Sequence, residues 1–146
     1  MTFKEWKLLS IDEAKEIIKN IANNEKFIEK ITINAKDGYK LFYFNDANTV
    51  RKRAEVIGKY SGLYSEASVN KLIIEFLIKE ADEIAEWLVN GLTYKCFKYN
   101  AGHYVGYIVN DKGTRQETSV LNFHLSKDTN YVGKIGFMID MISPTI

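Results

Sequence analysis

Residues 103–143 constrain the fold of this chain more than any other stretch. They read HYVGYIVNDKGTRQETSVLNFHLSKDTNYVGKIGFMIDMIS, three runs rich in valine, isoleucine, tyrosine and phenylalanine that polar clusters separate. A fourth such run, LTYKCFKYNA at residues 92–101, comes directly before them. Runs of this composition with turn residues between them predict antiparallel strands. The C-terminal part of the chain is therefore predicted to form a four-stranded antiparallel meander.

The N-terminal part carries helix and hairpin signals. Ser10 and Glu13 have the spacing of a capping box, in which two side chains satisfy free amides at the start of a helix. Two β-type runs follow, at residues 31–34 and 39–44. The Asp37-Gly38 pair between them predicts a β-hairpin, because both residues tolerate a positive φ angle.

Two further helices are predicted between the hairpin and the meander. Asp46 is a favourable N-cap for a helix that runs to about Tyr60. The longest helix begins at Ser65 or Ser68 and ends at Asn90-Gly91. Its apolar residues recur at helical spacing: Val69, Leu72, Ile73, Phe76, Leu77, Ile84, Trp87 and Leu88. A wide apolar stripe of this kind is typical of a helix packed on a core.

The order of these elements predicts an α+β fold. Helices and a hairpin come first and four strands come last, which favours helices packed on one face of an antiparallel sheet. The 146 residues are 46% hydrophobic and 27% charged, as in an ordinary globular domain. We therefore expect one α+β domain over residues 1–146.

Charge and cysteine content narrow the functional classes. The formal net charge is +1, so contact with nucleic acid would depend on a local basic patch. Cys96 is the single cysteine, which excludes an internal disulfide. No run reaches the ~18 apolar residues of a membrane helix, and MTFKEWKLL lacks the apolar core of a signal peptide. We expect a soluble cytoplasmic protein with no membrane partner, either a monomer or a homodimer.

Alternation along the last two runs assigns a polar and an apolar side to the meander. In the third run Thr118, Asn122 and His124 lie on the polar side. In the fourth run Lys134 and Asp140 lie on the polar side, and Met141 is placed on the apolar side. One face of an antiparallel sheet commonly stays in contact with water. These polar side chains are therefore expected to share an open face.

Two strand registers are possible for His103. If it pairs with His124, the two imidazoles lie about 5 Å apart at Cβ and could act together as acid and base. A register shifted by one residue instead turns Val105, Tyr107 and Val109 toward the apolar side. The shifted register buries more β-branched surface and is therefore favoured, and the paired-histidine register stays as the alternative.

The chemistry that two histidines favour is metal-independent cleavage of RNA. A base must take the proton of the 2′-hydroxyl and an acid must protonate the leaving 5′-oxygen, and histidine suits both roles. The candidate catalytic residues are His124 and His103. The candidate substrate-binding residues are Arg115, Thr118, Asn122 and Lys134 for polar contacts and Tyr104 and Tyr107 for stacking on bases. Neither a metal ion nor a cofactor is expected, because the two histidines match no known ligand spacing. A thiolate nucleophile formed by Cys96 and a histidine is a further alternative, but nothing in the sequence places the two side chains together.

Several short segments resemble a known group of toxins. They are FNDA at 44–47, IAEWL at 84–88, GHYVGYIV at 102–109 and ISPT at 142–145. Over about residues 44–146 the chain resembles the ribonuclease A-like toxin domains at the ends of contact-dependent inhibition proteins. It also resembles the broader group of barnase, EndoU, colicin and RelE-like nucleases.

The chain departs from that family at its catalytic positions. The family usually has a histidine near its N-terminal helix, whereas no histidine precedes His103 here. The family's terminal strand typically supplies a threonine and an aromatic residue, where this chain has Asp140 and Ile142. No catalytic residue is carried over from the resemblance.

Two functions follow as hypotheses. The first is a small toxin-type protein that acts on RNA as a metal-independent endoribonuclease, with its working face on the C-terminal sheet. The alternative is a non-enzymatic binding or immunity protein from a phage, a mobile element or a toxin–immunity pair. RNA is the expected partner in the first case and a cognate protein in the second.

Overall fold

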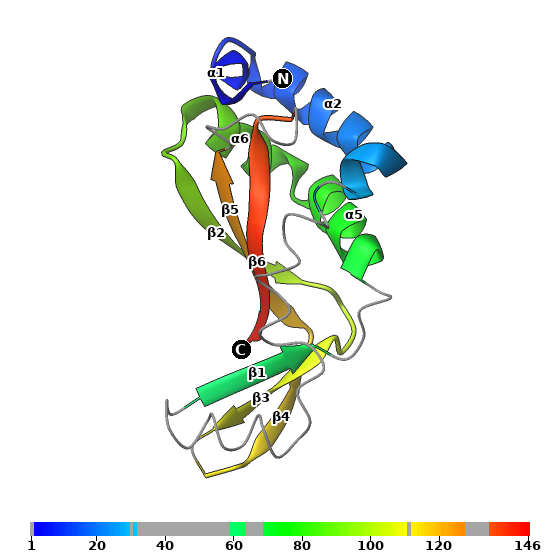
Figure 1. The fold of residues 1–146 in the computed structure, drawn as a ribbon, viewed down its shortest axis with the longest axis vertical. Coiled ribbons are helices and arrows are strands. Elements are labelled where there is room, and N and C mark those ends of the chain that lie inside the picture. Colours follow the sequence, from blue (N-terminus) through cyan, green and yellow to red (C-terminus); the bar gives the residue numbers. More distant parts are fainter. Residues whose placement is uncertain (1, 30, 32–58, 64–68, 111, 128–134) are drawn as a thin grey trace.

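The computed structural model describes residues 2–29, 31, 59–63, 69–110, 112–127 and 135–146. Helices gather around one end of a long three-stranded sheet, and a second, smaller sheet lies at the other end (Figure 1). The predicted hairpin at 31–44 falls almost entirely outside the described residues, as do Lys134 and most of the predicted helix at 46–60. The α+β class is confirmed.

The helix predicted to start after Ser10 is present, and a short helix that the sequence did not predict precedes it. α1 spans Phe3–Trp6, and α2 spans Ile11–Ala22 with Ser10 as its N-cap. The amide of Glu13 donates to Ser10 Oγ at 3.1 Å, and the amide of Ser10 donates to Glu13 Oε1 at 3.1 Å. The capping box is therefore confirmed, and it fixes the helix start because two backbone donors gain partners there.

The predicted longest helix is wrong as a single element. It is divided into α5, Val69–Lys79, and α6, Ala81–Asn90. Glu80 lies between them with φ −101° and ψ 17°, outside helical geometry. It stands four residues after Phe76 and three after Leu77, so a continuous helix would turn its carboxylate into the apolar stripe. The break leaves Glu80 half-buried and puts Ala81, 1% exposed, against the core.

In the described part of the chain, six strands form two antiparallel sheets. The main sheet has the order β2–β5–β6, with β2 Tyr94–Asn100, β5 Val120–Lys127 and β6 Phe137–Thr145. The small sheet has the order β1–β3–β4, with β1 Lys59–Leu63, β3 Gly106–Asn110 and β4 Arg115–Thr118. The predicted helix to Tyr60 is wrong at its end, because residues 59 and 60 belong to β1.

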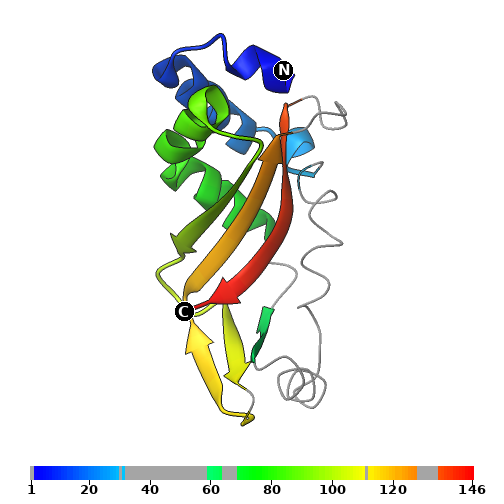
Figure 2. The same cartoon turned by 90° about the vertical axis from the view of Figure 1, so that its left-hand side faces the viewer.

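The predicted four-stranded meander is also wrong, because β2 pairs with β5 and not with β3. β2 runs into β3 and β4 into β5, so the two chain segments form one long ribbon that crosses from the main sheet to the small one (Figure 2). A loop at 101–105 separates β2 from β3 in the first of these two segments. Its ends stay tied across the ribbon, since Ala101 N donates to Ser119 O at 2.8 Å and Val105 N donates to Thr118 O at 2.9 Å.

Helices cover one face of the main sheet, and the alternation along β5 shows which face. Leu121, Phe123 and Leu125 are fully buried, and the residues between them are half-buried. Phe76 of α5 stacks on Phe123 with ring centroids 3.9 Å apart and planes 6° apart. This aromatic contact fastens the helical layer to the centre of the sheet. No helix among the described residues is long and apolar enough to cross a membrane.

The N-terminus closes the far end of the main sheet. Trp6 is fully buried, its indole N–H donates to Ile135 O at 2.7 Å, and its ring packs edge-on against Phe137. Gly136 has a φ angle of 81°, and a Cβ there would lie 2.6 Å from Trp6 Nε1. Only glycine fits at this close approach.

Candidate functional site

The second face of the main sheet carries most of its polar side chains, and we call it the polar face. It consists of Tyr94, Cys96, Lys98 and Asn100 of β2, Val120, Asn122, His124 and Ser126 of β5, and Met138, Asp140, Met141, Ser143 and Thr145 of β6. Each strand places alternate residues on this face because the side-chain period of a strand is two.

A β-bulge in β6 changes which residues reach this face. His124 pairs with Met141 and Leu125 with Ile139, so Asp140 is an extra residue in the ladder. A bulge of this kind lets two successive residues oppose one partner. Met141 is therefore half-buried beside Asp140, and Ile142 is fully buried. The predicted apolar placement of Met141 is wrong for this reason, whereas Asp140 lies on the polar face as predicted.

His124 and Tyr94 form the centre of the candidate site. The phenol oxygen of Tyr94 is hydrogen-bonded to His124 Nδ1. The two rings lie with centroids 6.0 Å apart and planes inclined by 29°. Tyr94 is 53% exposed, so the pair is open to solvent from the Tyr94 side.

Cys96 is the cross-strand partner of His124. Lys127 N donates to Thr93 O and Ala101 N donates to Ser119 O, each at 2.8 Å, which fixes the phase of the ladder. In an antiparallel pair the hydrogen-bonded and non-hydrogen-bonded pairs alternate, so Cys96 and His124 form a non-hydrogen-bonded pair. Their Cα atoms are then expected about 4.5 Å apart, the closer of the two spacings. Sequence reasoning had no means to find this neighbour.

Asp140 and Ser126 extend the site on the other side of His124. Ser126 Oγ donates to Asp140 Oδ1 at 3.0 Å. Burial lowers the pKa of His124 below its ordinary value, and the nearby charge of Asp140 opposes this only in part. At neutral pH the imidazole is therefore uncharged and can accept a proton.

The neighbouring phenol and thiol keep their protons at neutral pH. Burial, helped by Cys96 and Asp140, raises the pKa of Tyr94. Burial also raises the pKa of the Cys96 thiol. A protonated thiol is a poor nucleophile, so these protonation states favour proton transfer by His124 over attack by Cys96. Among the described residues no three His, Cys, Asp or Glu side chains come together to hold a metal ion.

Of the two registers considered, the one that pairs His103 with His124 is wrong. His103 lies in the 101–105 loop, exposed, with Nδ1 3.2 Å from Ala101 O. The place opposite His124 belongs to Cys96. The β2–β5 pair and the β3–β4 pair differ in register, and the residues of the loop take up the difference. Strand alternation alone does not reveal such extra residues. The shifted register correctly predicts that three side chains of this run are buried. Their exposed fractions are 7% for Val105, 8% for Tyr107 and 5% for Val109.

Thr118 was predicted to lie on the polar face, and this prediction is wrong. It is 6% exposed and belongs to β4. Its Oγ1 donates to Thr145 O at 2.6 Å and accepts from Val120 N at 3.1 Å. The hydroxyl therefore ties β4 and the start of β5 to the end of β6.

The other predicted contact residues fall in three places. Asn122 shares the polar face with His124, one cross-strand row away, and pairs with Lys98. Tyr104 is 67% exposed in the same loop as His103. Arg115 lies over the ring of buried Tyr107 at 4.1 Å in the small sheet, and its Nε is 3.0 Å from Glu117 Oε1.

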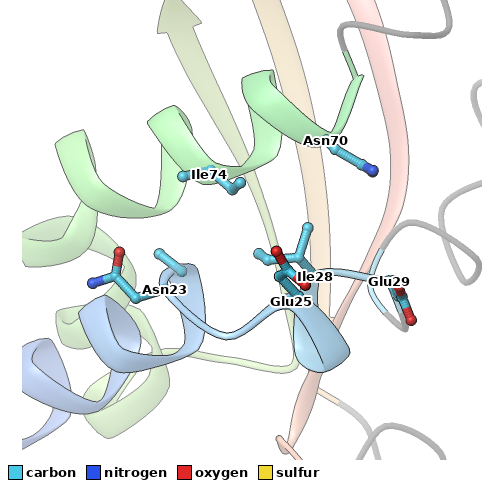
Figure 3. A pocket seen from close by; sticks show the side chains of 7 residues that line it. Asn23, Glu25, Ile28, Glu29, Asn70 and Ile74 are labelled. Carbon is cyan, nitrogen blue, oxygen red and sulfur yellow. The ribbon is translucent and has the colours of Figure 1, made fainter.

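The hollows on the surface of the described part of the chain include the following two. One, of about 430 Å³, lies between α5 and the residues after α2 (Figure 3). Its lining residues are Ala22, Asn23, Glu25, Ile28, Glu29, Asn70 and Ile74. The other, of about 280 Å³, adjoins the site, since it is lined by Glu86, Trp87, Asn90, Gly91, Leu92, Tyr94 and Lys95.

Comparison with known proteins gives a match in fold. One chain of a structure described as "Crystal structure of CdiA-CT/CdiI complex from Y. kristensenii 33638" superposes with a TM-score of 0.65. The match covers 74% of this chain and 97% of that chain at 12% sequence identity. At this identity the likeness establishes the shared fold alone. No protein-family model matches the sequence, and no curated protein matches it.

Proposed function

We propose that this protein is the RNA-cleaving toxin of a toxin–immunity pair, a metal-independent endoribonuclease whose working surface is the polar face. The observation that carries the proposal is the hydrogen-bonded Tyr94–His124 pair, in which a neutral imidazole meets a protonated phenol on the solvent-accessible side of the sheet. The fold shared with a chain of a CdiA-CT/CdiI complex supports the toxin–immunity setting. So does the resemblance of residues 44–146 to toxin domains of contact-dependent inhibition proteins.

The pair can carry both proton transfers of RNA cleavage. In the productive tautomer Nδ1 of His124 donates to the phenol oxygen of Tyr94, which leaves Nε2 free as the base. Nε2 takes the proton of the 2′-hydroxyl while the 2′-oxygen bonds to phosphorus and the bond to the 5′-oxygen breaks. Tyr94 gives its proton to the 5′-oxygen and takes one back from Nδ1. The products are a 2′,3′-cyclic phosphate and a 5′-hydroxyl.

Two polar residues of the next row would hold the phosphate under this proposal. Lys98 and Asn122 pair across β2 and β5, two residues along each strand from Cys96 and His124. Residues on one face of a strand are spaced by about 7 Å, within the reach of a lysine side chain. Lys98 would thus contact the scissile phosphate or its neighbour while His124 reaches the 2′-hydroxyl.

The test is cleavage of purified tRNA and rRNA without added metal. We expect wild type to cut, and His124→Ala to lose about 10²–10⁴-fold in rate, the usual contribution of a general acid–base residue. Tyr94→Phe should lose a similar factor. His103→Ala is the matched control and should retain full activity. Folded wild type that leaves every RNA intact would overturn the proposal.

A second candidate is a non-enzymatic protein that binds a cognate toxin or immunity protein. The charge distribution favours it, because the chain has a net charge of only +1 and Lys98 is the one basic residue that the structure describes on the polar face. RNA binding usually draws on a larger basic surface. A stoichiometric complex with a protein partner, formed by a chain that cuts no RNA, would support this candidate.

A further inference from the structure

The outer edge of β2 has backbone groups that no described strand pairs with. β2 is a terminal strand in the order β2–β5–β6. Thr93 pairs with Lys127 and Ala101 pairs with Ser119 through backbone hydrogen bonds. Because hydrogen-bonded pairs alternate along an antiparallel ladder, the backbone N–H and C=O groups of the odd-numbered residues of β2 point toward β5. The amides and carbonyls of the even-numbered residues therefore point outward: Tyr94, Cys96, Lys98 and Asn100. An edge of this kind is a template for an added strand.

A hollow beside this edge is lined in part by Trp87, whose buried indole N–H is, among the described residues, an unsatisfied donor. The 280 Å³ hollow lies between the end of α6 and the start of β2, next to Leu92, which is 85% exposed. Trp87 forms part of its wall and is 3% exposed, and its Nε1 has no hydrogen-bond partner in the described part of the chain. Buried polar groups normally have a partner. An acceptor from a molecule seated in the hollow would supply one.

Three charged side chains determine which strand fits: Lys95 and Glu86 in the wall of the hollow, and Lys98 on the polar face, so the positive charges are in excess. Lys95 lines the hollow on the helical side of β2, and Lys98 is exposed on the polar face. Lysines on an edge strand disfavour pairing with another copy of the same strand. Opposite charges across a strand pair are favourable. The edge therefore suits an acidic strand and resists self-association.

We propose that β2 is the docking edge for an extended acidic segment of a partner protein, which joins the main sheet as an added strand. One carboxylate of that segment meets Lys95 and the indole N–H of Trp87 in the hollow. A second carboxylate, three residues away and on the opposite side of the added strand, meets Lys98. The segment also covers the exposed side of Tyr94, so its binding closes access to His124. The docking does not depend on the proposed RNA cleavage.

The test uses the whole chain, labelled with ¹⁵N, and two synthetic peptides with blocked ends, TEVTEVT and TKVTKVT. We expect the acidic peptide to bind at least tenfold more tightly than the basic one. The outward amides of β2 and the Trp87 indole N–H should shift and become protected from hydrogen exchange. Lys95→Glu and Lys98→Glu should each weaken binding of the acidic peptide by about tenfold or more. Lys71→Glu, on the exposed side of α5, is the matched control and should not change it.

Three results would overturn the docking proposal. They are equal affinity for the two peptides, no binding of the acidic peptide at millimolar concentration, and a chain dimer in which the β2 amides are already protected. Circular dichroism of each lysine variant confirms that it is folded. Loss of RNA cleavage in His124→Ala has no bearing on these outcomes, so the two proposals fail separately.

Discussion

Cys96 and His124 face each other across β2 and β5 in a pair that shares no backbone hydrogen bonds. This is the closer of the two antiparallel spacings, so any group added to the sulfur lies beside the imidazole. The thiol is exposed, but burial of its surroundings raises its pKa. Cys96 is therefore accessible without being reactive at neutral pH.

The first prediction concerns blocking of the site through this cysteine. Cys96→Ala should keep RNA cleavage within about twofold, because the thiol has no role in the proton transfers. Alkylation of wild type with N-ethylmaleimide should abolish cleavage, since the adduct fills the space next to His124. The alkylation rate should rise steeply above pH 8, as the thiolate is the reacting form. Alkylated protein that still cuts RNA would place the working surface elsewhere.

The second prediction is a pH dependence of stability that comes from His124. Its pKa is lowered in the fold, first through burial, whereas the pKa of a histidine in an unfolded chain is about 6.5. The unfolded chain therefore binds the proton before the folded chain does, and the free energy of unfolding falls as the pH drops below about 6.5. Urea unfolding at pH 7.5 and 5.5 measures this loss. His124→Gln should reduce it, and His103→Gln should leave the His124 contribution in place.

Local signals in the sequence predicted local structure well. The Ser10–Glu13 capping box depends on four adjacent residues and is present as expected. Pairing between strands could not be predicted in the same way. The 101–105 loop shifts the register between the two halves of the ribbon, and it replaces His103 by Cys96 as the neighbour of His124.

The candidate site was predicted only in part, because the sequence shows local patterns but not which strands pair. Strand alternation placed His124, Asn122 and Asp140 on one face, because a period of two is a local property. It could not reveal the hydrogen bond between Tyr94 and His124 or the proximity of Cys96, because both depend on which strand lies next to β5. It also missed the bulge beside Asp140, since an extra residue in a ladder leaves no mark in composition.

The third prediction separates a structural from a substrate-binding role for Thr118. Its hydroxyl makes two hydrogen bonds to backbone groups in the protein interior. Thr118→Val keeps the shape but removes both, so it should lower the free energy of unfolding by about 1–3 kcal/mol. Thr118→Ser should restore most of the loss. If Thr118→Val instead weakens RNA binding at unchanged stability, the residue contacts substrate and the structural role is wrong.

The fourth prediction compares two glycines that have the same backbone angle in different surroundings. Gly102 and Gly136 both have a φ of 81°. A Cβ at Gly102 meets nothing within 4 Å, so Gly102→Ala should cost only the strain of a left-handed residue, about 1–2 kcal/mol. A Cβ at Gly136 would lie 2.6 Å from Trp6 Nε1 and 2.8 Å from the carbonyl carbon of Thr2, and backbone atoms cannot give way easily.

Gly136→Ala should therefore cost about 3 kcal/mol or more, because it adds a steric clash to the same strain and displaces the indole from Ile135 O. Urea unfolding of the two variants measures the difference. Tryptophan fluorescence should shift to longer wavelength for Gly136→Ala alone, as Trp6 loses its buried position. The double variant Gly136→Ala with Trp6→Ala offers a further check, since removal of the indole should relieve part of the clash. Equal losses for the two glycines would mean that the N-terminal segment does not pack against the start of β6 in solution.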